Sequence, residues 1–265
     1  MWLRITCCLE FELELPTALI LMLRPRSGAQ QWLAREEYKI SPMVPVVEHT
    51  DAYGNLCQRL VAPAGRFSIQ TTADVNTSNL VDINPGEPFI EIQNLPNNVL
   101  NYLLPSRYCE SDRFNDLARL ITAQQVPGYD QVAAIEKWLH DTIEYIPGSS
   151  DYPISAVEVN LRQSGVCRDL AHLGIALCRS LSIPARMAVG YMYNLHPMDM
   201  HAWFEAFVGG RWYTFDATQS GPKGGYVVIG FGSDAADVAV YNQFGLAAFP
   251  LQHVVNVELI EEEMF

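Results

Sequence analysis

The sequence predicts an α+β protein, with an N-terminal β-sandwich-like half followed by helices and then by antiparallel strands. The first hundred residues alternate apolar and polar side chains with period two, whereas helical spacing begins after Pro105. Strand patterns return after residue 184, and helices followed by strands are typical of the α+β class. With 265 residues, of which 49% are apolar and 18% charged, the chain can bury a substantial core. We expect two domains, residues 1–105 and 106–265.

The N-terminal strands are predicted from alternation and from turn residues. Residues 9–15 (LEFELEL) alternate strictly, which indicates a half-buried strand, and 17–23 continue as a short apolar strand. Residues 38–47 carry two prolines and therefore predict an edge strand or an extended connector. Two further strands are expected at 56–61 and 66–75.

Three helices are expected in the second half, followed by three strands. Residues 113–125 carry an apolar face, and Asp130 is placed to cap a second helix that ends before Pro147. A third helix opens at residues 164–167 and ends at Pro184. The strands expected after it cover residues 185–193, 200–208 and 211–216.

The last two of these strands form a predicted hairpin. Gly209-Gly210 between two alternating runs is a signal for a two-residue turn. Such a turn makes Val208 oppose Arg211 and so fixes the register of the whole hairpin. A slip of one residue would turn every side chain of one strand to the other face.

The predicted register brings a histidine and an aspartate together. Counting outward from the turn puts Asp216 opposite Trp203, on the same face as His201 and diagonal to it. Diagonal neighbours lie about 7–8 Å apart between backbones, which an imidazole and a carboxylate can span. A carboxylate there would orient the ring and stabilise an imidazolium, as a nucleophile's base requires.

Cys167 is the candidate nucleophile for this pair. It lies at the start of the third predicted helix, where free N–H groups and the helix dipole favour a thiolate and can also bind an oxyanion. Gly165 before it allows a sharp turn, and Gln163 is a chemically suitable second oxyanion donor whose direction is not defined. Considered alone, Cys167 is better explained as a buried core cysteine, because most free cysteines are buried.

A metal site is the alternative interpretation of these cysteine and histidine residues. Cys167 and Cys178 lie eleven positions apart on one predicted helix, or about 16 Å at 1.5 Å per residue, too far to share one ion. His172 points about 140° around the helix from Cys167. No set of ligands emerges, so we expect neither a metal nor another cofactor.

The net charge of −13 argues against two classes of partner. An acidic chain repels the phosphates of nucleic acid and of anionic lipid head groups, so we expect neither nucleic acid nor a membrane surface as a partner. Three glutamates (Glu10, Glu12 and Glu14) interrupt the apolar N-terminal stretch, which therefore does not match a secretory signal. A cytoplasmic location is the expectation.

The segments around the three candidate residues resemble those of the transglutaminase-like superfamily, in particular its bacterial branch with an N-terminal β domain. The matching motifs are GVCRD at 165–169, MHAWFE at 200–205 and FDAT at 215–218. The strong part of the resemblance covers roughly residues 130–240. Ala217 stands where the family usually has proline, and Met200 stands where it often has aspartate or glycine.

The resemblance implies a papain-like core in which Cys167, His201 and Asp216 form a catalytic triad. It implies an enzyme that attacks an amide or ester of a peptide or protein and forms a thioester, most simply a cysteine protease or amidase. Transfer of the acyl group to an amine, and a non-catalytic peptide-binding module on the same scaffold, are the alternatives. In this interpretation Trp203 lines the substrate channel and Tyr191 belongs to a rim over the cleft.

Overall fold

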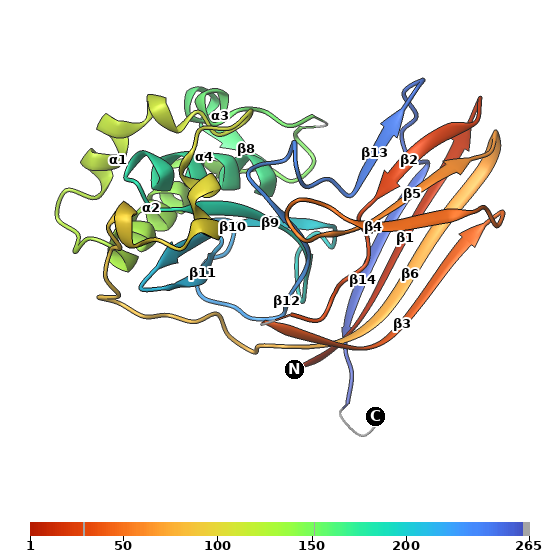
Figure 1. Cartoon of the computed structure of the whole chain (residues 1–265), viewed down its shortest axis with the longest axis horizontal. Helices are drawn as coiled ribbons and strands as arrows, with labels where there is room; N and C mark the ends of the chain where they lie inside the picture. Colours follow the sequence, from red (N-terminus) through yellow and green to blue (C-terminus); the bar gives the residue numbers. More distant parts are fainter. Residues whose placement is uncertain (29, 151, 262–265) are drawn as a thin grey trace.

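The computed structural model describes residues 1–28, 30–150 and 152–261 (Figure 1). Two antiparallel sheets make up one half of the molecule, and helices packed on a third sheet make up the other half. This α+β arrangement of mostly antiparallel sheets agrees with the expectation from the sequence. None of the helices in these described ranges is long and apolar enough to cross a membrane.

Two four-stranded sheets form what we call the β domain. The first has the order β14-β1-β6-β3, with strands Gln252–Leu259, Trp2–Leu13, Gly65–Thr77 and Gln31–Ser41. The second has the order β13-β2-β5-β4, with strands Tyr241–Phe244, Thr17–Leu21, Leu56–Ala62 and Val46–Thr50. The proline-bearing segment 38–47 contains the end of β3 and the start of β4, which are both edge strands, so that prediction is confirmed.

Alternation along β1 builds the core of the β domain. Every second side chain from Leu3 to Phe11 is fully buried, while the intervening residues are partly exposed. Buried residues of β2, β5 and β6 belong to the same apolar cluster. Burial of one face is the physical basis of the period-two pattern.

The domain boundaries differ from the expected division at residue 105. The chain returns to the β domain at its end, where β13 pairs with β2 and β14 pairs with β1. Residues well before 105 already pack on the other half, since Val99 and Leu95 are buried against Phe207. Turn-rich composition marks a connector but does not reveal which surface that connector packs on.

Within the described residues, the helical half contains four α-helices and three short 3-10 helices. The α-helices are α1 (Asn115–Ile121), α2 (Tyr129–Thr142), α3 (Ala156–Arg162) and α4 (Cys167–Ser180), and the 3-10 helices are η1 (Ile92–Asn94), η2 (Asn97–Leu103) and η3 (Ser111–Arg113). The sequence did not predict α3. Asp130 is the second residue of α2 rather than its cap, and its carboxylate accepts a hydrogen bond from the Gly86 backbone.

The third sheet supports α4, which lies at the centre of this half (Figure 1). Its order is β11-β10-β9-β12, with strands Arg211–Phe215, His201–Val208, Ala185–Met192 and Tyr226–Gly232. Gly174 of α4 lies over Phe204 of β10, and a Cβ added there would lie 2.7 Å from the phenyl ring. The absence of a side chain therefore lets the helix approach the sheet closely. A two-stranded parallel pair, β7 (Glu144–Tyr145) and β8 (Ser164–Gly165), lies just before α4 in the chain.

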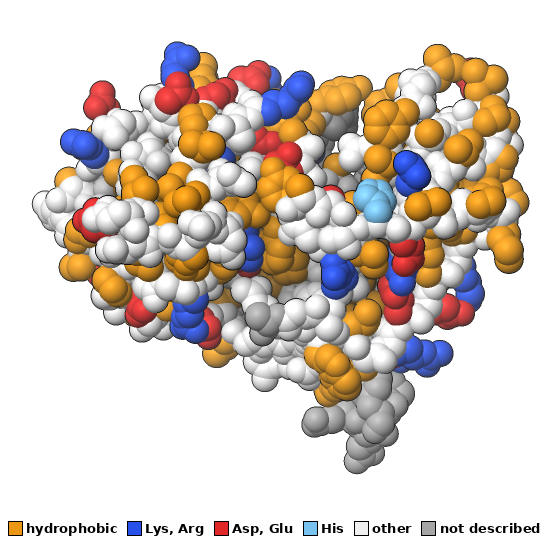
Figure 2. Space-filling view, viewed as in Figure 1, with side chains coloured by type: hydrophobic (Ala, Val, Ile, Leu, Met, Phe, Trp, Pro, Cys, Tyr) orange, Lys and Arg blue, Asp and Glu red, His pale blue; other side chains and the backbone are white. Residues whose placement is uncertain are grey.

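Apolar side chains gather on the outer ends of the β-domain strands, at the upper right of Figure 2. Residues there that remain more than half exposed include Leu15, Phe244 and Leu246. On the other half, charged and apolar side chains are interspersed on the visible face.

Candidate active site

Cys167 is the first residue of α4. Val166 before it is extended and acts as the helix cap, and its N–H donates to the Asp169 carboxylate at 3.2 Å. Asp169 therefore caps the start of α4. Because Cys167 begins the helix, its own N–H has no carbonyl one turn back and is available to a ligand.

His201 and Asp216 are joined by a direct hydrogen bond. His201 Nε2 lies 2.7 Å from Asp216 Oδ2, and a carboxylate can only accept, so the ring nitrogen donates. The hairpin has the predicted register, with Val208 opposite Arg211 across the Gly209-Gly210 turn. Both glycines have positive φ (58° and 94°), as the predicted two-residue turn requires.

The other ring nitrogen of His201 is left for Cys167. Nδ1 is buried and has no hydrogen-bond partner among the described residues. The Cys167 side chain interacts with the ring, without an aligned hydrogen bond, and raises its pKa. Since Nε2 is already bound to Asp216, this contact falls to Nδ1. The three predicted residues are thus brought together in the order Cys167, His201, Asp216.

Electrostatics favour a charged His201–Asp216 pair. Burial by itself lowers the pKa of His201, but the charge and hydrogen bond of Asp216, followed by Cys167, raise it to about 10. Burial raises the pKa of Asp216, but His201 and Thr218 outweigh that effect and the net pKa is lowered. At neutral pH an imidazolium and a carboxylate therefore stabilise each other in a site that excludes water.

Asp216 is held by three residues outside the predicted triad. Thr218 donates to Oδ1 through its backbone N–H (3.0 Å) and its hydroxyl (2.7 Å), and the Tyr226 hydroxyl donates to Oδ2 at 2.9 Å. The backbone N–H of Asp216 donates to the Glu136 carboxylate at 2.6 Å. Thr218 lies in the FDAT motif, where its role could have been anticipated. Turns separate Tyr226 from Asp216, and eighty residues separate Glu136 from it. No local sequence pattern indicates that either residue contacts Asp216.

Glu136 is a buried carboxyl behind the triad. Burial raises its pKa to about 7, the hydrogen bond from Asp216 lowers it, and the Asp216 charge adds to the rise. One turn further along α2, His140 Nδ1 lies 3.0 Å from the Ala217 carbonyl. Helix α2 therefore fixes the backbone of Asp216 and Ala217 through these two contacts.

A cleft of about 390 Å³ opens beside Cys167 and His201. Tyr145 of β7 lines this cleft, and β7 pairs with β8 so that Tyr145 lies opposite Gly165. Burial, followed by the charges of Cys167, Asp216 and Asp199, raises the pKa of Tyr145. Its hydroxyl therefore stays protonated and can donate a hydrogen bond next to Cys167. The sequence did not identify this residue.

Two predicted substrate contacts lie elsewhere. Tyr191 is fully buried and its hydroxyl donates to the Leu23 carbonyl at 2.7 Å, so it anchors β9 to the β domain rather than forming a rim. Trp203 is only 1% exposed and does not line the cleft; its ring stacks beside His201 with centres 6.0 Å apart. The Trp203 ring therefore covers one side of the His201 imidazole.

Gln163 and His172, two further candidate residues, have structural roles. The Gln163 side chain turns back to the Asn160 carbonyl, and Gln163 itself adopts the left-handed conformation (φ 56°) at the end of α3. His172 is buried, bonded to the Ile154 carbonyl and to the Ala235 N–H, and burial lowers its pKa to about 4. It is therefore a neutral structural histidine. In the part of the chain that the structure describes, no three His, Cys, Asp or Glu side chains converge to hold a metal ion.

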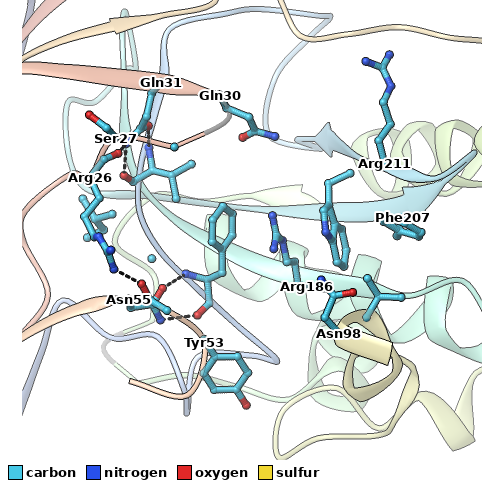
Figure 3. Close-up of a pocket in the computed structure, with 18 of the residues that line it drawn as sticks. Arg26, Ser27, Gln30, Gln31, Tyr53, Asn55, Asn98, Arg186, Phe207 and Arg211 are labelled. Atoms are coloured by element: carbon cyan, nitrogen blue, oxygen red, sulfur yellow. Dashed lines mark hydrogen bonds between the residues drawn. The ribbon is translucent and has the colours of Figure 1, made fainter. Parts of the chain in front are cut away.

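A larger cavity, of about 890 Å³, lies between the β domain and the other half and contains none of the three triad residues (Figure 3). Its floor carries Arg186, whose guanidinium carbon lies 4.1 Å from the centre of the Trp212 ring and 3.6 Å from that of Phe231. Arg186 is also paired with the buried Glu205 at 2.7 Å. The Arg186 cation is thus neutralised by Glu205 and covered by two aromatic rings.

Comparisons with known proteins agree with this geometry. Residues 115–217 match the family model of the transglutaminase-like superfamily. The crystal structure of a proposed cysteine protease from Cytophaga hutchinsonii superposes with a TM-score of 0.90 at 34% identity, covering 100% of this chain and 92% of that one. A protein of Mycobacterium leprae with no assigned function is 27% identical over 256 residues, which is 89% of each chain.

The similarity to the Cytophaga protein extends over the β domain as well as the helical half, so it includes the returning C-terminal strands. Identity at that level over the whole chain, together with the matching core model, establishes common descent. The chain is a member of the transglutaminase-like superfamily.

Proposed function

We propose that the protein is a cysteine hydrolase that cleaves an amide bond of a peptide or protein through a thioester on Cys167. One observation carries the proposal: His201 Nε2 is bonded to Asp216, Nδ1 of the same ring has no partner among the described residues, and Cys167 interacts with this ring. This arrangement supplies a nucleophile, a base and an orienting carboxylate within one buried contact chain.

The first half of the reaction forms the thioester. His201 carries a proton on Nδ1 as an imidazolium, and the thiolate form of Cys167 attacks the carbonyl carbon, so that an S–C bond forms and the carbonyl oxygen becomes negative. His201 then gives its proton to the nitrogen of the leaving amine as the C–N bond breaks. Asp216 keeps the ring oriented and stabilises the imidazolium throughout.

The second half releases the acid. A water molecule gives a proton to His201 Nδ1 while its oxygen attacks the thioester carbonyl. The C–S bond breaks, a carboxylic acid leaves, and the proton returns to sulfur or remains on the ring as an ion pair. The description of the Cytophaga relative as a cysteine protease supports water, rather than an amine, as the acceptor.

Two donors are candidates for binding the negative oxygen. One is the N–H of Cys167 at the start of α4. The other is the hydroxyl of Tyr145, a residue that lines the cleft and whose backbone pairs with Gly165 on the adjoining strand. We expect Tyr145→Phe to lower kcat by about 10²-fold, because one oxyanion donor is lost. Alkylation of Cys167 forms no oxyanion and should keep its rate.

The primary test is reaction of the intact protein with iodoacetamide near neutral pH, followed by peptide mapping. Cys167 should label fast, and His201→Ala should slow that labelling strongly, whereas Cys8, which is also partly exposed, is the internal control. Labelling of Cys8 and Cys167 at the same slow rate would contradict the proposal. Incubation with a peptide mixture, with and without a primary amine, then distinguishes the reactions by mass spectrometry: cleavage alone means hydrolysis, and amine incorporation means transfer.

A further inference from the structure

The cleft beside Cys167 has a largely apolar wall. Its aliphatic and thioether side chains come from β9, β10, the loop between them and the segment between β12 and β13, and six of them carry the argument: Met187, Val189, Leu195, Ala202, Val238 and Val240. Five of these six are buried, and Val240 is partly exposed. The volume of about 390 Å³ lies at the small end of the range for ligand pockets. The cleft therefore fits one large side chain together with a short stretch of backbone.

The β domain supplies the outer wall of the same cleft. Tyr241 of β13 and His253 of β14 both line it, and these strands belong to the two β-domain sheets. The Tyr241 ring packs edge-on against Phe11 in the core of the β domain, with ring centres 5.4 Å apart. His253 Nδ1 lies 3.7 Å from the Asp199 carboxylate on the facing loop. The wall is thus anchored in the β domain and reaches across to the catalytic half.

Two charged groups of the cleft are already engaged or lie at its rim. The Arg168 guanidinium donates to Asp169 and to Ser150, and Asp199 is exposed beside His253. An aliphatic side chain that leaves water for the apolar wall gains hydrophobic free energy. A glutamine amide placed against the same wall loses hydrogen bonds to water that this wall does not replace. The apolar wall therefore discriminates against the side chain that a glutamine transamidase must bind.

We propose that this cleft is a specificity subsite for an aliphatic side chain next to the scissile carbonyl, and that the β domain, through Tyr241 and His253, forms its outer wall. The inference rests on the proposed function, because it assumes that the scissile carbonyl lies at Cys167. It gives the β domain a role in the choice of substrate in addition to its structural role.

The test measures binding separately from turnover. Cys167→Ala is titrated with a blocked peptide that carries leucine at the central position and with its glutamine counterpart, and both Kd values are measured by calorimetry. We expect the leucine peptide to bind at least tenfold more tightly. Equal affinities, or a preference for glutamine, would overturn the subsite whether or not the wild-type enzyme cleaves anything.

Charge substitution locates the subsite. In the Cys167→Ala background, Val240→Asp should abolish the preference for leucine and favour a lysine peptide instead. Val254→Asp is the matched control, because Val254 lies on β14, is 45% exposed and does not line the cleft. If both substitutions remove the preference equally, the effect is general and the subsite is refuted. Should Val240→Asp fold poorly, Val240→Phe narrows the same wall without a charge and should shift the preference from leucine to alanine.

The contribution of the β domain has its own variant. His253→Ala should weaken binding of the leucine peptide severalfold, and His49→Ala, on the exposed strand β4, should not. In the Cys167-containing protein the control substitution His49→Ala should leave the iodoacetamide rate unchanged, because His49 lies on exposed strand β4 away from the cleft. If Cys167 is labelled slowly in the unmodified protein, the proposed function is refuted. The Kd values of the two peptides then test the subsite independently. An unchanged affinity in His253→Ala would remove the β domain from the substrate wall.

Discussion

The side-chain amide of Gln31 pairs in both directions with the backbone of Val228 on the edge strand β12. Gln31 Oε1 accepts from the Val228 N–H at 2.7 Å, and Gln31 Nε2 donates to the Val228 carbonyl at 2.8 Å (Figure 3). Asn55 repeats the arrangement at Phe231, with distances of 2.8 and 2.7 Å. Two amides of the β domain, one at the start of β3 and one in the loop between β4 and β5, thus replace a neighbouring strand at this edge. They join the β domain to the sheet that carries His201.

We predict that Gln31→Ala destabilises the protein by about 2–4 kcal/mol, because the N–H and the carbonyl of Val228 lose their partners in a buried joint. The midpoint of urea unfolding measures the loss. Gln30→Ala is the control, since Gln30 is exposed and should leave the midpoint unchanged. A loss of equal size in both variants would mean that the loop, rather than the paired amide, is responsible.

Asp216→Asn is expected to change how stability depends on pH. The folded-state pKa of His201, about 10, lies above the ordinary value of 6.5, so its stabilising contribution is complete below about pH 6.5 and is lost as pH rises toward 10. Without the carboxylate charge, burial dominates and the pKa of His201 falls. Unfolding of the wild type should therefore become easier between pH 6.5 and 9.5 by more than that of the variant. NMR titration of His201 checks the assignment directly, and an unchanged His201 pKa in Asp216→Asn would contradict it.

Glu136→Gln should stabilise the protein above neutral pH. The pKa of Glu136 is raised from 4.5 to about 7, so the ionised carboxylate reduces folded-state stability progressively as pH rises from 4.5 to 7, by an amount on the order of 3 kcal/mol. Glutamine keeps the acceptor for the Asp216 N–H and removes the titration. The unfolding midpoint of the variant should exceed that of the wild type at pH 8 and match it near pH 4.5. Glu136→Ala, which lacks the acceptor, should be less stable at both pH values.

Arg179→Lys is predicted to be strongly destabilising, by about 3 kcal/mol or more. The buried guanidinium donates twice to the Ala185 carbonyl (3.0 and 2.8 Å) and also to the carbonyls of Leu104 (2.9 Å) and Ser233 (2.7 Å). It thereby joins α4 to three separate segments, and an ammonium group cannot reproduce this fork of donors. The Tm measures the effect. Arg162→Lys, at an exposed site on α3, should keep the wild-type Tm.

The parts of the site that depend on local spacing could be predicted from the sequence. The Gly209-Gly210 turn determines which residues of its hairpin face each other, and this places Asp216 beside His201. The position of Cys167 at a helix start follows from the residues around it. Both inferences use contacts within a few residues or across one tight turn, where backbone geometry leaves few alternatives.

Other parts needed contacts between distant segments. Glu136, Tyr226 and Tyr145 reach the site from a helix and two strands whose placement depends on packing of the whole domain. The expected rim position of Tyr191 was wrong because period two tells which side chains share a face of β9 but not what covers that face. The structure covers it with the segment after β2.

By itself, then, the sequence determined the strand pattern of the β domain, the Gly209-Gly210 hairpin and the identity of the three candidate catalytic residues. Only the tertiary structure decided that the C-terminal strands return to the β domain, that Tyr241 and His253 line the cleft, and that Gln31 and Asn55 close the edge of β12. Turns and periodicities express the preferences of a few consecutive residues. The pairing of segments two hundred residues apart depends on which surfaces bury the most apolar area together, and no local pattern encodes that choice.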